Sequence, residues 1–134
     1  MIILDTHAAI WIAEGMLKPG ATKIVEAAAQ RSQLFISPIS AWEIGMLVEK
    51  GRLKIAIPVH EYVGALFGRR GIQVAPISAD IALEAAILPR HFHADPADCL
   101  IVATSAAYGA RLVTRDQRIH AFAKDTKYLQ CVPC

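Results

Sequence analysis

Two aspartates come directly after short apolar runs that are typical of buried strands. Asp5 follows the run 2–4, and Asp116 follows the run 111–114 after one intervening residue. In an open α/β sheet, ligands collect at the carboxyl ends of the parallel strands. We therefore expect both carboxylates to face one edge of a sheet, where acidic groups could bind a cation.

Three further acids lie in the first turns of predicted helices next to such runs. Glu43 belongs to the helix after the run 34–36, and Asp95 and Asp98 open the helix that precedes the run 111–114. Two like charges 4 Å apart repel by about 4 kcal/mol at an effective dielectric of about 20, so converging carboxylates require a proton or a cation. A set of carboxylates without Cys or His suits Mg²⁺ or Mn²⁺. Such an ion can activate water and stabilise a phosphoryl transition state.

Each of these acids also has a purely structural interpretation. Ser40 and Glu43 have the spacing of a capping box, with Ser40 as the N-cap. Asp95 can cap the next helix, whose dipole favours an acid at Asp98. Asp116 could cap the last helix in the same way. Both interpretations stay open for each acid alone, and their occurrence together favours a metal site.

Strand-like and helix-like segments alternate along the whole chain, which predicts a mainly parallel sheet covered by helices on both faces. The predicted strands are 2–4, 34–36, 72–77, 111–114 and a weaker one at 128–131. The predicted helices are 6–15, 21–31, 41–50, 59–70, 79–88, 95–108 and 117–124. We expect one three-layer α/β/α domain over residues 1–134, with a sheet of four or five strands.

The composition agrees with a protein that has a large core. Apolar residues make up 54% of the 134 residues and charged ones only 19%, so part of the apolar surface could also be covered by a partner. Three cysteines, an odd number, do not make a disulfide framework. The start MIILD lacks the features of a signal peptide, and the uncharged run 99–110 is too short to span a bilayer. These features predict a soluble, cytoplasmic protein without a membrane segment.

Four stretches together resemble the PIN-domain ribonucleases, in particular the toxin component of VapBC-type toxin–antitoxin pairs. They are ILDTHAAIW at 3–11, ISPISAWEI at 36–44, HADPADCLIVATS at 93–105 and LVTRD at 112–116. The resemblance implies a PIN-like fold, an endoribonuclease that depends on Mg²⁺ or Mn²⁺, and a homodimer. It also implies inhibition by a cognate VapB-type antitoxin.

The family's acidic residues correspond to Asp5, Glu43, Asp98 and Asp116, which the resemblance implies as metal ligands and catalytic groups. In the family the third ligand lies three residues before an Ile/Leu-x-Ala sequence, and Asp98 has this spacing to the sequence at 101–103. Asp95 is then mainly a helix cap with an outer role at the metal. The other residues expected to support the site are Thr6, Thr114 and Arg115.

Other residues have weaker functional interpretations. His91 and His93 have a spacing that could bind a metal, although a loop position more often means packing or solvent contact. Trp11 and Trp42 are expected to pack in the core, with anchoring of a partner as the alternative. Cys131 and Cys134 have C-x-x-C spacing, but no helix follows them, which disfavours a redox motif.

Two other classes of function fit the sequence less well. Another metal-dependent phosphoryl hydrolase is disfavoured because Asp5-Thr6-His7 lacks the second acid of a D-x-D phosphatase motif. The chain contains neither a G-x-G-x-x-G run nor a P-loop. The second alternative is a PIN-like module that binds RNA or a partner without cutting it.

Overall fold

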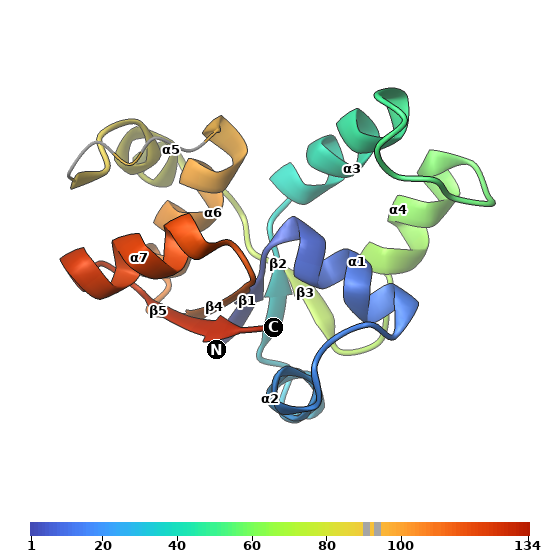
Figure 1. Ribbon diagram of the computed structural model, residues 1–134, viewed down its shortest axis with the longest axis horizontal. Helices are drawn as coiled ribbons and strands as arrows, with labels where there is room; N and C mark the ends of the chain where they lie inside the picture. Colours follow the sequence, from blue (N-terminus) through green and yellow to red (C-terminus); the bar gives the residue numbers. More distant parts are fainter. Residues whose placement is uncertain (90–91, 93–94) are drawn as a thin grey trace.

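The computed structural model describes residues 1–89, 92 and 95–134, and it centres on a parallel sheet of five strands (Figure 1). The order across the sheet is β3-β2-β1-β4-β5, and every neighbouring pair is parallel. The strands are β1 (Ile2–Leu4), β2 (Leu34–Ile36), β3 (Ile72–Val74), β4 (Arg111–Thr114) and β5 (Gln130–Pro133). The predicted parallel sheet of four or five strands is confirmed.

The central strands end at the same level of the sheet. Leu4 at the end of β1 is in register with Ile36 of β2 and with Val113 of β4. The chain order reverses between β1 and β4, which is the topological switch point where open α/β sheets bind ligands. The backbone N–H of Asp5 donates to the Val113 carbonyl at 3.1 Å, so the exits of these two strands are joined.

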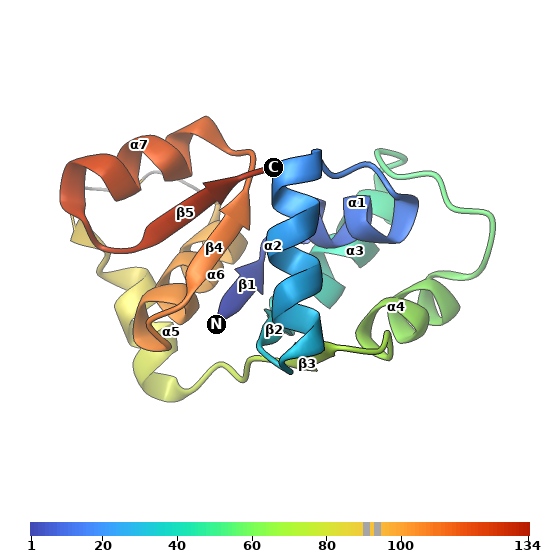
Figure 2. The ribbon, with the colours of Figure 1, turned by 90° about the horizontal axis from the view of Figure 1, so that it is seen from below.

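Seven helices are found in the described part of the chain, and they lie on both faces of the sheet (Figures 1 and 2). Helices α1 to α4 share one hydrophobic cluster with the sheet, α6 and α7 share the other, and α5 packs on α6. They are α1 (Thr6–Glu14), α2 (Pro19–Gln30), α3 (Ile39–Glu49), α4 (Val59–Phe67), α5 (Ala79–Ala86), α6 (Pro96–Ala107) and α7 (Gln117–Thr126). The predicted α/β/α layers are confirmed.

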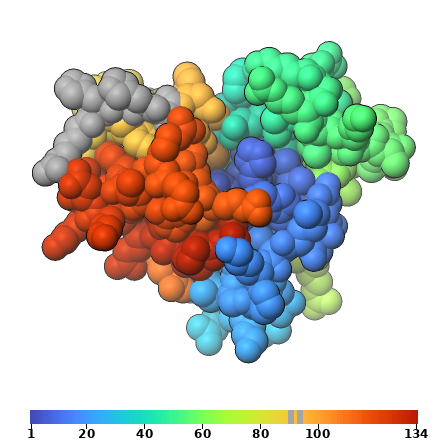
Figure 3. All heavy atoms as spheres, in the orientation of Figure 1, coloured from blue at the N-terminus to red at the C-terminus, as the bar shows by residue number. Residues whose placement is uncertain are grey.

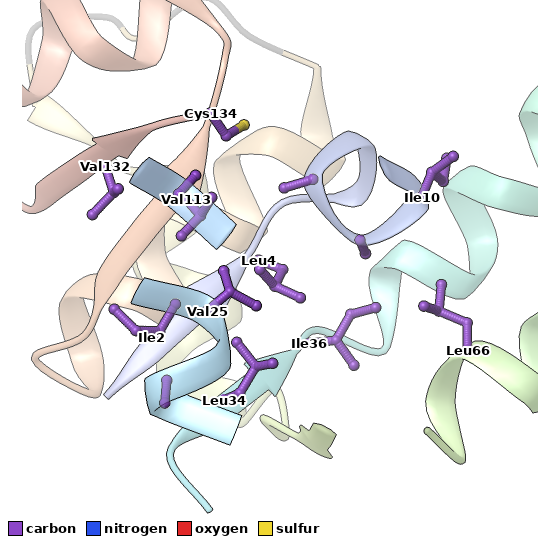
Figure 4. Packing of buried hydrophobic residues seen from close by; sticks show 14 of the residues in the cluster. Ile2, Leu4, Ile10, Val25, Leu34, Ile36, Leu66, Val113, Val132 and Cys134 are labelled. Carbon is purple, nitrogen blue, oxygen red and sulfur yellow. The ribbon is translucent and has the colours of Figure 1, made fainter. Parts of the chain in front are cut away.

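The alternation of side chains along the strands separates the two clusters. Leu4, Ile36 and Val113 point into the cluster beneath α1 to α4 (Figure 4), whereas Ile3 and Leu112 point toward α6 and α7. All five side chains are fully buried. Because both faces of the central strands are covered, the positions at which these strands end are firmly held.

Several predicted helix and strand ends were wrong by a few residues. Helix α4 ends at Phe67 instead of Arg70, and the chain turns through Gly71 into β3. Gly71 has a φ of +89°, and a Cβ there would lie 2.8 Å from the Cβ of Ala29, so this turn requires glycine. Helix α5 ends before the predicted segment 87–88, and strand β3 ends before the predicted segment 75–77. Strand β5 begins two residues later than expected. No helix in the described residues has the length and apolar character needed to cross a bilayer.

Candidate metal and active site

A cavity of about 410 Å³ opens at the carboxyl ends of β1 and β4. Four chain segments far apart in the sequence contribute to it, and Figure 3 shows this face of the molecule, where α6 and α7 in orange meet α1 and α3 in blue and teal. The lining residues are Asp5, Thr6, His7, Trp11, Glu43, Asp95, Asp98, Arg115, Asp116 and Arg118. The cavity therefore contains all four acids predicted as ligands, together with the supporting Thr6, Asp95 and Arg115.

Asp5 is held rigidly at the end of β1. Its side chain is 7% exposed and caps α1 by accepting a hydrogen bond of 2.7 Å from the Ala8 N–H. Burial raises the pKa of Asp5 above its ordinary value, although hydrogen bonds from Thr114 and Ala8 act against this rise. Thr114, one of the predicted supporting residues, thus contacts Asp5 directly.

Glu43 is held by α1 and not by its own helix. The Thr6 hydroxyl donates to Glu43 Oε1 and also lies 2.9 Å from the Ser40 hydroxyl. The predicted capping box was wrong, because α3 begins at Ile39 and Ser40 is a buried residue of its first turn. Burial raises the pKa of Glu43, and the charge of Asp95 adds to this rise while the Thr6 hydrogen bond opposes it.

Asp95 both caps α6 and faces the acidic cluster. Its Oδ1 accepts a hydrogen bond of 2.9 Å from the Asp98 N–H, as the prediction of an N-cap requires. Oxygens of Glu43, Asp95 and Asp98 also lie within 4.8 Å of one another, the one compact group of potential metal ligands among the described residues. The predicted ligands Asp5 and Asp116 line the same cavity outside this compact group.

Asp98 has a strongly perturbed acidity. Burial raises its pKa to about 7, and the charges of Asp95, Glu43, Asp116 and Asp5 contribute to the same rise. Asp98 therefore retains a proton at pH values where an isolated aspartate is ionised, which lessens the repulsion among the carboxylates. A divalent cation would balance this charge, and a donor set made of carboxylates matches the oxygen preference of Mg²⁺ or Mn²⁺.

Asp116 lies in a different electrostatic setting on the β4–α7 side. It caps α7 by accepting from the Arg118 N–H at 2.8 Å, and the Arg118 guanidinium donates to its Oδ2 at 3.2 Å. Burial favours a higher pKa for Asp116, but the hydrogen bonds and charge of Arg118 outweigh it and hold the pKa below its ordinary value. The sequence reasoning missed Arg118, although a cation two residues after a capping acid was a usable signal.

Trp11 forms the apolar side of the cavity. It is partly buried against the core cluster of α1 to α4, and the Arg115 guanidinium carbon lies 3.9 Å from its ring centroid. The His7 ring, which is exposed, lies 6.0 Å from the Trp11 ring. Trp42 is 55% exposed, so the prediction that it packs in the core was wrong.

The remaining candidates are two histidines and two cysteines. His91 and His93, considered as a metal pair, lie outside the described residues. Cys131 and Cys134 pack into different hydrophobic clusters, and burial raises the pKa of both thiols to about 11. A thiol with such a pKa is a poor nucleophile at neutral pH.

Comparisons with known proteins identify the family. The sequence pattern of the PIN domain matches residues 2–125. Ribonuclease VapC22 of Mycobacterium tuberculosis is 36% identical over 122 residues, which cover 90% of each protein.

Solved structures share the fold at lower sequence identity. VapBC2 from Rickettsia felis, bound to a DNA fragment from its promoter, matches with a TM-score of 0.72 at 19% identity and covers 99% of this chain and 98% of its own. FitAB bound to a DNA fragment matches with a TM-score of 0.60 at 18% identity, covering 99% and 94%. A toxin–antitoxin complex from Klebsiella pneumoniae gives 0.58 at 22% identity, covering 87% of each chain. The chain therefore belongs to the PIN domain family and is a VapC-type member of it.

Proposed function

We propose that this protein is an endoribonuclease that requires Mg²⁺ or Mn²⁺ and hydrolyses RNA phosphodiester bonds. We further propose that residues 1–134 act as one PIN domain and as the toxin of a type II toxin–antitoxin pair. The observation that carries the enzymatic part is the carboxylate cluster in a cavity at the switch point of the sheet. The similarity of the chain to a protein named as a ribonuclease supports RNA as the substrate.

In this proposal Asp5, Glu43, Asp98 and Asp116 hold one or two cations, directly or through water. The bound ion would lower the pKa of a water molecule and offset charge on the phosphate oxygens. Glu43 is the residue best placed to orient the attacking water, because the Thr6 hydroxyl fixes its Oε1, while its Oε2 has no hydrogen-bond partner among the described residues.

The partners follow from the family. The neighbouring structures named as VapBC and toxin–antitoxin complexes support a small VapB-type antitoxin as the inhibitor of this chain. We also propose that the chain forms a homodimer, as the resemblance implies. Exposed apolar side chains such as Trp42 on α3 and Leu83 on α5 are compatible with partner contacts.

Cleavage of a labelled single-stranded RNA by the purified chain tests the enzymatic part. We expect cleavage with Mg²⁺ or Mn²⁺, none with EDTA, and a loss of at least about 100-fold in Asp5→Asn. Asparagine can still accept the hydrogen bond from Ala8, so this variant keeps the helix cap.

Asp80→Asn is the matched control, because Asp80 is an exposed first-turn acid of α5 that does not line the cavity. It should cleave like the wild type. Equal cleavage by Asp5→Asn and wild type would contradict the proposal and would indicate a contaminating nuclease. RNA binding without any cleavage by the wild type would favour the non-cleaving module.

A further inference from the structure

The two arginines at the mouth of the cavity are held in different ways. Arg118 forms an ion pair of 3.2 Å with Asp116 and lies 4.0 Å from Asp98. Arg115 forms no ion pair with a carboxylate in the part of the chain that the structure describes, and its guanidinium lies over the Trp11 ring. Arg118 therefore balances charge within the protein, whereas the charge of Arg115 is available to a ligand.

Trp11 restrains the Arg115 guanidinium, whose central carbon lies over the indole ring at 3.9 Å from its centroid. The indole is itself anchored because it packs against the core cluster beneath α1 to α4. A guanidinium that stacks on an aromatic ring uses its face for this contact and leaves its N–H edges free. Those edges match the paired oxygens of a phosphate, and restraining the guanidinium in advance reduces the entropy lost on binding.

An RNA that approaches this cavity meets an excess of negative charge. Five carboxylates line it against two arginines, one of which is already paired. A cation in the cluster would offset charge at the phosphate that is cut, but it does not hold the rest of the RNA backbone. A cation outside the cluster and free of carboxylate partners is suited to that task, and Arg115 has both properties.

We propose that Arg115, positioned by Trp11, binds the RNA backbone phosphate next to the one that is cleaved. This inference rests on the proposed ribonuclease function and adds the residue that aligns the substrate. Trp11 is a positioning residue in this account, since it acts through the guanidinium. The contact affects the binding of substrate more than the chemical step.

Cleavage kinetics on a short single-stranded RNA at two salt concentrations test the role of Arg115. Loss of one charged hydrogen-bonded contact in Arg115→Ala should raise KM about 10-fold or more, with kcat changed less than about 3-fold. The slope of log KM against log salt concentration should also decrease by roughly the amount expected for one phosphate contact. Arg115→Lys keeps the charge without the planar edge. Its KM should fall between those of the wild type and of Arg115→Ala.

Trp11 variants separate positioning from simple folding. Trp11→Leu keeps an apolar side chain without the aromatic face and should raise KM about 2- to 5-fold, the size of an exposed cation–π contact. Trp11→Phe should restore most of the wild-type KM. If Trp11→Leu changed only the melting temperature, the positioning role would be wrong.

The control is Arg111→Ala, at the opposite end of β4, where the arginine is exposed and distant from the cavity lining. Its KM should equal that of the wild type, and a KM for Arg115→Ala equal to that of Arg111→Ala would overturn the proposal.

If the wild type cleaved no RNA, fluorescence anisotropy with the same RNA and Ca²⁺ would still test the contact between Arg115 and the RNA. Weaker binding by Arg115→Ala than by Arg111→Ala would support the contact although the enzymatic proposal had failed, and equal binding would refute it.

Discussion

The two sides of the cavity use the same residue type in opposite electrostatic settings. Asp98 on the α6 side and Asp116 on the α7 side both lie at the start of a helix. The pKa of Asp98 is raised to about 7 by burial and by neighbouring acids, whereas Arg118 holds the pKa of Asp116 below its ordinary value. A helix N-terminus therefore does not by itself decide the charge state of an acid; burial and the charges of neighbouring side chains do. Among the described residues, the α3–α6 side, made of Glu43, Asp95 and Asp98, carries no cation of its own, and Arg118 of the β4–α7 side approaches Asp98 only to 4.0 Å while it pairs with Asp116 at 3.2 Å.

The largest effect expected from this difference is a pH dependence of stability in the metal-free protein. The folded-state pKa of Asp98 is raised from 3.8 to about 7, so the fold binds this proton more tightly than the unfolded chain does. The stabilisation is complete below pH 3.8 and is lost as the pH rises through about 7, and its upper limit of about 4 kcal/mol is reduced by solvent screening of this partly exposed group. Urea unfolding in EDTA from pH 4.5 to 8 measures it. In Asp98→Asn the free energy of unfolding should depend less steeply on pH. An unchanged dependence on pH would contradict the raised pKa of Asp98.

The next effect concerns the chemistry of the α3–α6 side. Glu43→Gln removes a charge from the cluster and should lower RNA cleavage by about 100-fold or more, if the carboxylate binds the metal or orients water. Glu49→Gln, an exposed change at the end of the same helix, is the control and should retain full cleavage. Near-normal cleavage by Glu43→Gln would show that Glu43 neither binds an essential metal nor orients the attacking water.

A smaller effect is expected at the link between α1 and α3. Thr6→Val leaves the buried Ser40 hydroxyl and the Glu43 carboxylate without this partner, which should cost about 1–3 kcal/mol in the free energy of unfolding. Thr6→Ser keeps the hydroxyl, so its free energy of unfolding should fall much less. Denaturation of both variants with EDTA present compares them, and equal losses would show that the methyl group, not the hydroxyl, matters.

The smallest effect separates the two roles of Asp95. Asparagine caps a helix about as well as aspartate, so Asp95→Asn should leave stability nearly unchanged and lower only the affinity for Mg²⁺. Asp95→Ala removes the cap as well and should cost about 1 kcal/mol. Thermal unfolding and Mg²⁺ titration of the two variants distinguish these roles. Unaltered Mg²⁺ affinity in both would reduce Asp95 to a cap.

The sequence was sufficient to predict the elements and the acids at strand ends, because both depend on local patterns. Asp5 and Asp116 follow short apolar strands, and the parallel topology aligns those ends. The prediction failed where contacts cross between segments. Ser40 has a capping-box spacing, yet the packing of α3 against α1 directs its hydroxyl to Thr6. The same reason explains why Asp95 was assigned only an outer role, since its distance from Glu43 depends on how α3 and α6 pack together.

Titration calorimetry of Mg²⁺ with the metal-free protein tests the central claim most directly, because it needs no substrate. The wild type and Asp80→Asn should bind Mg²⁺ equally, with release of a proton near pH 7 as the cluster becomes fully charged. Asp98→Asn should bind at least about 10-fold more weakly and release no proton from this site. No binding by the wild type, or equal binding by Asp98→Asn, would contradict a cation site on the α3–α6 side of the cavity.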